Sequence, residues 1–192
     1  MLPVRIERFP TIETQRLLLR EIVVSDTEKL FALRNNPAVT RYLGRDDDKD
    51  SSAVEGMILK MHRDLETGSG VQWGICLSDS NELIGVVCLW QIDKRHHRAE
   101  IGFMLRPESW RQGIMSEALE AVLAYAFHTL RLHSLEANTS VANLASQAVL
   151  IQCGFVQEAH FRENWHYNGA FTDSLIFCKL TDVAAQPPIQ NS

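Results

Sequence analysis

The sequence EIGFMLRPESWRQGIMSEAL, residues 100–119, is the most informative part of the chain. Residues 100–105 are rich in apolar side chains and predict a strand, and residues 106–112 predict a loop. An amphipathic helix is predicted from Gly113 to Leu130. The start of such a helix can bind a phosphate, because its first N–H groups are unpaired and its dipole favours an anion. A glycine before a helix is also consistent with an ordinary turn, so both interpretations stay open.

The part of the chain that follows this helix predicts three strands and one further helix. Residues 134–140 predict a strand, and Asn143 is a suitable N-cap for a helix over residues 143–153. Gly154 is placed to end that helix as a C′ glycine. The last two strands are predicted over residues 155–161 and 171–180.

The part before residue 106 predicts four strands. The first covers residues 16–23. The other three are separated by short polar turns, which make them antiparallel neighbours, and they cover residues 71–77, 83–92 and 99–105.

Two helices are predicted between the first strand and the second. Ser25 and Glu28 have the spacing of a capping box, and the helix that they open ends at Asn35-Asn36-Pro37. The second helix covers residues 52–66 and ends at the glycines that follow. Residues 45–52 (RDDDKDSS) are expected to form a flexible, solvated loop and not a metal site.

These elements predict an α/β (α+β) fold with seven strands in a mostly antiparallel sheet flanked by helices. Residues 1–182 are expected to form a single domain, because neither a repeat nor a linker interrupts them. Residues 183–192 have little to bury and are expected to be a disordered tail.

Composition narrows the class of protein. The chain has 192 residues, is 45% hydrophobic and carries a net charge of -5, which argues against bare nucleic acid as a partner and suits a cationic substrate. Its apolar stretches are too short to cross a bilayer and Met1 to Glu13 lacks a signal peptide, so we expect a cytoplasmic protein that does not bind membranes. The cysteines are expected to be small buried hydrophobes, with neither a disulfide framework nor a zinc site: Cys76, Cys88, Cys153 and Cys178.

Three runs carry a resemblance to a known family: AEIGFML, SWRQGIMSEAL and EANTSVANLASQAVLIQCGF. Together they resemble the acetyl-CoA core of the GCN5-related N-acetyltransferases (GNAT). The opening TIETQRLLLREI is similar to the RimJ/RimL-type branch of ribosomal-protein N-terminal acetyltransferases, and the resemblance covers Thr11 to about Leu180. It implies a splay between the fourth and fifth strands, acetyl-CoA as cosubstrate and no metal.

The resemblance also implies which residues bind acetyl-CoA. The backbone of the fourth strand would pair with the pantetheine arm at Phe103, Met104 and Leu105. The pyrophosphate would lie against the loop and the helix start, at Arg111, Gln112, Gly113, Ile114, Met115 and Ser116. Asn143 would contact the CoA arm. Only Gly113 fits the strict family pattern, since Trp110 replaces a polar residue and Met115 replaces a small one.

Catalytic residues are implied in the same way. Leu150 stands where many family members have a tyrosine that protonates the leaving thiolate, and Ser146 occupies the place of the substitute in this branch. Glu100 stands where a carboxylate draws the proton from the amine. Ser146 could equally be an ordinary serine near a helix start, and Glu100 an ordinary strand glutamate. Asn164 to Tyr167 would either border the acceptor pocket or pack on the core as an aromatic loop.

The function expected from all this is acetyl transfer from acetyl-CoA to a primary amine, by direct attack in a ternary complex. The expected acceptor is the α-amino group of a protein N-terminus, of a ribosomal or another protein. The alternatives are a small-molecule amine (a polyamine, an amino sugar or a toxin) and a CoA-binding regulatory protein without turnover. Direct nucleic-acid binding is not expected, and the expectation allows a homodimer.

Overall fold

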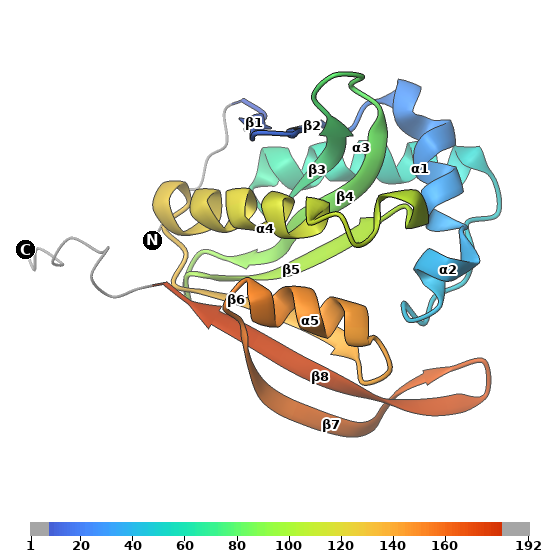
Figure 1. The fold of residues 1–192 in the computed structure, drawn as a ribbon, viewed down its shortest axis with the longest axis vertical. Helices are drawn as coiled ribbons and strands as arrows, with labels where there is room; N and C mark the ends of the chain where they lie inside the picture. Colours follow the sequence, from blue (N-terminus) through green and yellow to red (C-terminus); the bar gives the residue numbers. More distant parts are fainter. Residues whose placement is uncertain (1–7, 182–192) are drawn as a thin grey trace, which may run out of the picture.

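The computed structural model describes residues 8–181, which form one mixed sheet with helices on both faces (Figure 1). The expected tail at residues 183–192 lies outside the described residues, as do residues 1–7 and 182 of the expected domain. The α/β (α+β) class is confirmed.

The sheet has eight strands in the order β1-β2-β3-β4-β5-β6-β8-β7. Their bounds are β1 Ile12–Glu13, β2 Leu17–Glu21, β3 Val71–Leu77, β4 Leu83–Asp93, β5 Arg98–Leu105, β6 Ser134–Ser140, β7 Val156–Tyr167 and β8 Ala170–Leu180. The expectation of seven strands missed β1, because a strand of two residues carries no measurable alternation. The ends of β7 and β8 also extend further into their hairpin than the expected strands.

Five α-helices connect the strands: α1 Thr27–Arg34, α2 Pro37–Thr40, α3 Ser51–Thr67, α4 Ile114–Ala124 and α5 Leu144–Gln152. The single helix expected from Gly113 to Leu130 is α-helical only to Ala124, and a π-helical turn continues it over Tyr125–Thr129. The capping box expected at Ser25 is wrong. A 3-10 turn over Val24–Asp26 precedes α1, and the Asp26 carboxylate accepts a hydrogen bond from Val23 N–H.

Each face of the sheet has its own hydrophobic core. Neighbouring residues of a strand point to opposite faces, so Ile75 packs with the residues of α4 while Cys76 packs with those of α1 and α3. In Figure 1, α4 and α5 accordingly cover one face, and α1 and α3 cover the other.

The expected splay lies between β5 and β6. These strands are parallel, with α4 in the connection between them, and every other neighbouring pair is antiparallel. Their register pairs only Arg98–Glu100 with Ser134–Glu136, although both strands continue. Beyond Glu100, one edge of β5 has no strand partner within the described part of the chain. The fold therefore opens a gap between the carboxyl halves of two parallel strands, a common place for a ligand.

Candidate active site

The loop between β5 and α4 is held by hydrogen bonds from its own side chains. Trp110 Nε1 donates to the Leu105 carbonyl at 2.7 Å, and Gln112 Nε2 donates to the Glu108 carbonyl at 2.8 Å. Arg111 and Gly113 both have left-handed backbone, with φ of 58° and 73°. Gly113 is the N-cap residue of α4 and has no side chain to cap the helix. The first N–H groups of α4 are therefore left for a ligand, as phosphate binding requires.

The predicted site residues at the start of α4 have buried side chains. Ile114 and Met115 point into the core, with Met115 only 8% exposed. Ser116 is also buried, and its Oγ donates to Gln152 Oε1 of α5 at 3.2 Å. This explains how Met115 can replace a small residue: its side chain leaves the loop and fills the core. Arg111 and Gln112 are exposed beside the loop.

Arg16 and Glu117 are two residues at this loop that the sequence did not indicate. Arg16 Nε donates to Glu117 Oε2 at 2.6 Å, and Arg16 Nη1 donates to the Gln112 carbonyl at 2.9 Å. Thr14 Oγ1 also donates to Glu117, at 2.6 Å. The opening motif TQRL contains Thr14 and Arg16, but a contact between residues this far apart in sequence leaves no local signal.

Glu117 is a charged group at this helix start. Partial desolvation acts to raise its pKa, but hydrogen bonds from Thr14 and Arg16 outweigh that effect and hold the pKa below its ordinary value. Glu117 is therefore ionised at neutral pH. Arg16 balances its charge.

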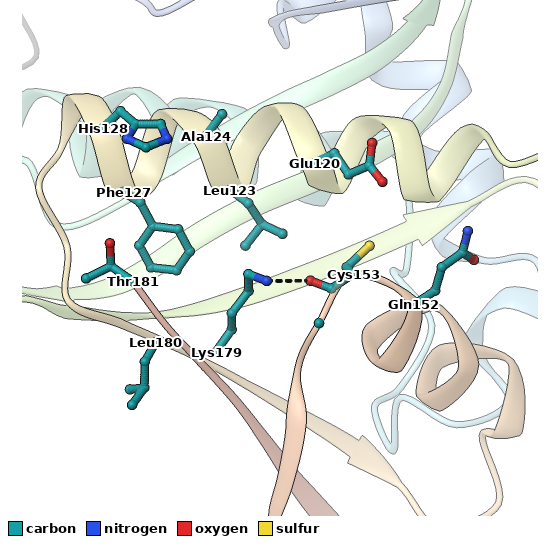
Figure 2. A pocket seen from close by; sticks show the side chains of 11 residues that line it. Glu120, Leu123, Ala124, Phe127, His128, Gln152, Cys153, Lys179, Leu180 and Thr181 are labelled. Carbon is teal, nitrogen blue, oxygen red and sulfur yellow. Dashed lines mark hydrogen bonds between the residues drawn. The ribbon is translucent and has the colours of Figure 1, made fainter. Parts of the chain in front are cut away.

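A pocket of about 470 Å³ lies beside this loop. Its lining includes Gly113, Ser116 and Glu117 together with Gln152 of α5. A second pocket of about 470 Å³, drawn in Figure 2, shares Glu120 and Gln152 with the first and continues between α4 and the end of β8. There Lys179 Nζ donates to the Cys153 carbonyl at 2.8 Å. Of the predicted CoA-binding residues, Gly113 and Ser116 line the first pocket and none lines the second.

The start of α5 holds a second group of predicted site residues. Asn143 Oδ1 accepts a hydrogen bond from Ser146 N–H at 3.2 Å, so Asn143 is the N-cap that the sequence predicted. Ser146 is half-buried one turn before Leu150, which is 0% exposed within the core. Leu150 is thus a packing residue, and Ser146 is the polar group on that side of the helix.

Glu100 lies where β5 and β6 separate. It is half-buried and faces Glu136 in the parallel register, and Gln91 Nε2 donates to Glu100 Oε2 at 3.3 Å. Burial raises the pKa of Glu100, and the charge of Glu136 raises it further. A carboxylate with a raised pKa is a better proton acceptor than an ordinary glutamate.

The remaining predicted residues of β5 pack through their side chains. Phe103 and Leu105 contact the core under α4, and Met104 contacts the core on the other face. Their backbone forms the edge of β5 beyond the last pair with β6. The predicted residues therefore fall into two groups. One follows β5 into α4, the other follows β6 into α5, and parallel strands bring their carboxyl ends to the same edge of the sheet.

The aromatic segment before the last strand contacts the loop after α2. Trp165 Nε1 donates to the Gly44 carbonyl at 3.4 Å, and Tyr167 Oη donates to the Arg45 carbonyl at 2.8 Å. Trp165 remains about half exposed. The β7–β8 hairpin and the loop at residues 44–45 are therefore joined, and a border of the acceptor site stays a prediction for them.

Residues 8–181 contain no cluster of three or more metal-ligating side chains, and no helix among them has the length and apolar character to cross a membrane. All four cysteines are free. Cys76 and Cys153 are buried as expected, whereas Cys88 and Cys178 are only partly buried.

Comparison with known proteins agrees with the geometry of the loop and the splay. The family model described as "Acetyltransferase (GNAT) domain" matches residues 16–156. The uncharacterized N-acetyltransferase YoaA of Bacillus subtilis (strain 168) is 36% identical over 88% of this chain and 96% of its own length.

Relatives of known activity are more distant. The spermidine N(1)-acetyltransferase of Vibrio cholerae is 27% identical over 82% of this chain and 89% of its own length. The alanine N-acetyltransferase of ribosomal protein uS5 from Escherichia coli (strain K12) is 27% identical over 66% of this chain and 64% of its own length. A solved structure of RimL, the ribosomal L7/L12 alpha-N-protein acetyltransferase in complex with coenzyme A, superposes with a TM-score of 0.81 at 21% identity, covering 92% of this chain and 100% of that one.

Proposed function

The chain belongs to the GNAT acetyltransferases and is an acetyl-CoA-dependent N-acetyltransferase, and on this premise we propose that its acceptor is the α-amino group of a protein N-terminus. The observation that carries the proposal is the carboxylate at the splay. Glu100 is a half-buried carboxylate with a raised pKa, at the point where β5 and β6 part.

An α-amine needs less proton removal before it can attack than a more basic amine does. An α-amino group has a pKa of about 8, so roughly a tenth of it is already uncharged at pH 7. An aliphatic amine like that of lysine has a pKa of about 10.4, and well under a hundredth of it is uncharged at that pH. Glu100 would therefore need to remove a proton from a smaller fraction of an α-amine than of an aliphatic amine. Two further facts support the proposal: the opening TIETQRLLLREI resembles the ribosomal-protein branch, and a relative acts on ribosomal protein uS5.

The proposed reaction is a direct transfer. The amine nitrogen attacks the thioester carbonyl carbon, the carbon–sulfur bond breaks, and CoA leaves as a thiolate. Glu100, directly or through a water, takes the proton that the amine loses. Ser146 donates a hydrogen bond toward the leaving sulfur. Acetyl-CoA would be held by the backbone of Phe103 to Leu105 and of Arg111 to Ser116, and by Asn143.

A small cationic amine such as a polyamine is the second candidate acceptor. One observation favours it: a relative that covers most of this chain is a spermidine acetyltransferase. The net charge of -5 suits a polycation as well as a basic peptide.

Release of free CoA thiol from acetyl-CoA tests the proposed function. The panel contains peptides with a free N-terminus, spermidine and an amino sugar, each at the same concentration. We expect the highest kcat/KM with a peptide. Preference for spermidine would support the second candidate, and no release with any amine would indicate a CoA-binding protein without turnover. A cytoplasmic location, a homodimer and the lack of direct nucleic-acid and membrane binding remain part of the proposal.

A further inference from the structure

Arg16 is held beside the phosphate loop, and its contacts with residues 8–181 do not use all its hydrogen-bond donors. Its Nε bonds Glu117 and its Nη1 bonds the Gln112 carbonyl. A guanidinium carries further N–H groups on both terminal nitrogens. Arg16 Nη2 lies 3.5 Å from the point that a Cβ on Gly113 would occupy. The free donors of Arg16 are therefore next to the residue where the loop turns into α4.

The contact with Gln112 bears on the shape of the loop. Gln112 lies between Arg111 and Gly113, the two left-handed residues. A left-handed conformation is unfavourable for a residue other than glycine, so Arg111 needs support from its surroundings. Arg16 provides it through the Gln112 carbonyl, and the Gln112 side chain adds a second tie to Glu108.

The contact between Arg16 and Glu117 affects the net charge at the start of α4. A carboxylate in the first turns of α4 would repel a phosphate at the helix start. Arg16 pairs with that carboxylate at 2.6 Å and offsets its charge while remaining 47% exposed. Without Arg16 the loop would lose a cation and be left with an unbalanced Glu117.

We propose that Arg16 is a positioning and binding residue for the pyrophosphate of acetyl-CoA: it holds the loop open at Gln112, offsets Glu117 and donates its remaining N–H groups to the phosphates. The inference rests on the proposed function, and specifically on this loop as the pyrophosphate site. It assigns the N-terminal segment that contains Thr14 and Arg16 a role in cosubstrate binding.

The test compares acetyl-CoA with S-acetyl-pantetheine, which has the same thioester arm but lacks the pyrophosphate and the nucleotide. Arg16→Ala should raise the Kd for acetyl-CoA roughly 10- to 100-fold, the range for losing a charge-assisted hydrogen bond. The KM for S-acetyl-pantetheine should stay within twofold. The Kd of Arg16→Lys for acetyl-CoA should lie between the values of the wild type and of Arg16→Ala, because lysine keeps the charge but lacks the planar guanidinium group. Lys60→Ala, which removes an exposed ion pair with Asp64 on the other face of the sheet, is the matched control.

Salt dependence separates phosphate contact from a purely structural role. If Arg16 contacts the phosphates, the dependence of log Kd on log salt should be shallower in Arg16→Ala than in the wild type. Unchanged acetyl-CoA affinity in both Arg16 variants would overturn the inference, and so would an equal loss for the two thioesters. Wild-type protein that fails to bind acetyl-CoA would instead contradict the proposed function itself.

Discussion

Glu100 of β5 and Glu136 of β6 face each other at the last paired position before the two strands separate. Glu136 is tied to Arg98 by an ion pair of 2.5 Å, whereas Glu100 accepts a hydrogen bond from the Gln91 amide. The pKa of Glu100 is raised first by burial and then by the charge of Glu136. The start of the splay therefore holds a carboxylate suited to accept a proton.

Glu136→Gln should shift the pH dependence of turnover. It removes the like charge opposite Glu100 and frees Arg98, and both changes lower the pKa of Glu100. Because Glu100 acts when deprotonated, the acidic limb of kcat against pH should move to lower pH. Glu66→Gln, an exposed glutamate of α3, is the control. An acidic limb that stays in place in Glu136→Gln would show that Glu100 does not set it.

Glu100→Gln should lower turnover most at neutral pH. The amide cannot take a proton, so the variant depends on amine that is already uncharged, and that fraction grows with pH. The ratio of wild-type to variant kcat should therefore shrink as pH rises. A ratio that is constant across the profile would assign Glu100 a structural role.

Gly113→Asp should abolish CoA binding, since its carboxylate would lie against the pyrophosphate. The left-handed φ of Gly113 strains any side chain there, although the space around a Cβ is open except for Arg16 at 3.5 Å. Gly113→Asn carries the same strain without the charge and is the matched control. We expect calorimetry to find weaker binding for Asn and none for Asp. Equal affinities for the two variants would remove the charge argument, and wild-type affinity in both would refute the phosphate loop.

Ser146→Ala should reduce turnover while leaving acetyl-CoA affinity nearly unchanged. The cap on α5 uses the Ser146 backbone N–H, which alanine retains, so the helix should stay intact. General acid help is typically worth about 10²–10⁴-fold, and the effect here should lie at the lower end because a thiolate leaves readily. Ser146→Thr keeps a hydroxyl and should retain more activity than Ser146→Ala. Wild-type kcat in Ser146→Ala would leave Ser146 as a helix residue only.

Much of the fold could be predicted because its signals are local. The strands at 71–77 and 134–140 have the predicted bounds. As expected, Asn143 caps the start of α5 and the left-handed Gly154 follows its end. The start of α1 was missed because the preference of Ser25 for a cap is overridden by Asp26, which Arg20 holds with two hydrogen bonds. The π-helical end of α4 has no sequence signature.

The local backbone geometry of the candidate site was predictable from the sequence, and the contacts between distant residues were not. Gly113 and Asn143 are N-cap residues that the local sequence predicts. Arg16 and Glu117 lie far apart in the sequence, so their ion pair could be seen only in the structure. The packing of Leu150 could also be seen only in the structure. Its complete burial shows that a larger side chain such as tyrosine would overpack the core there.

One measurement tests the central claim most directly: intact mass and fragment spectra of two peptides of the same sequence, one with a free α-amino group and one with it blocked, after incubation with acetyl-CoA and the enzyme. We predict one added acetyl group on the free peptide, located at its first residue, and none on the blocked peptide. Acetylation of the blocked peptide on a side chain, or no acetylation of either peptide, would contradict transfer to a protein N-terminus.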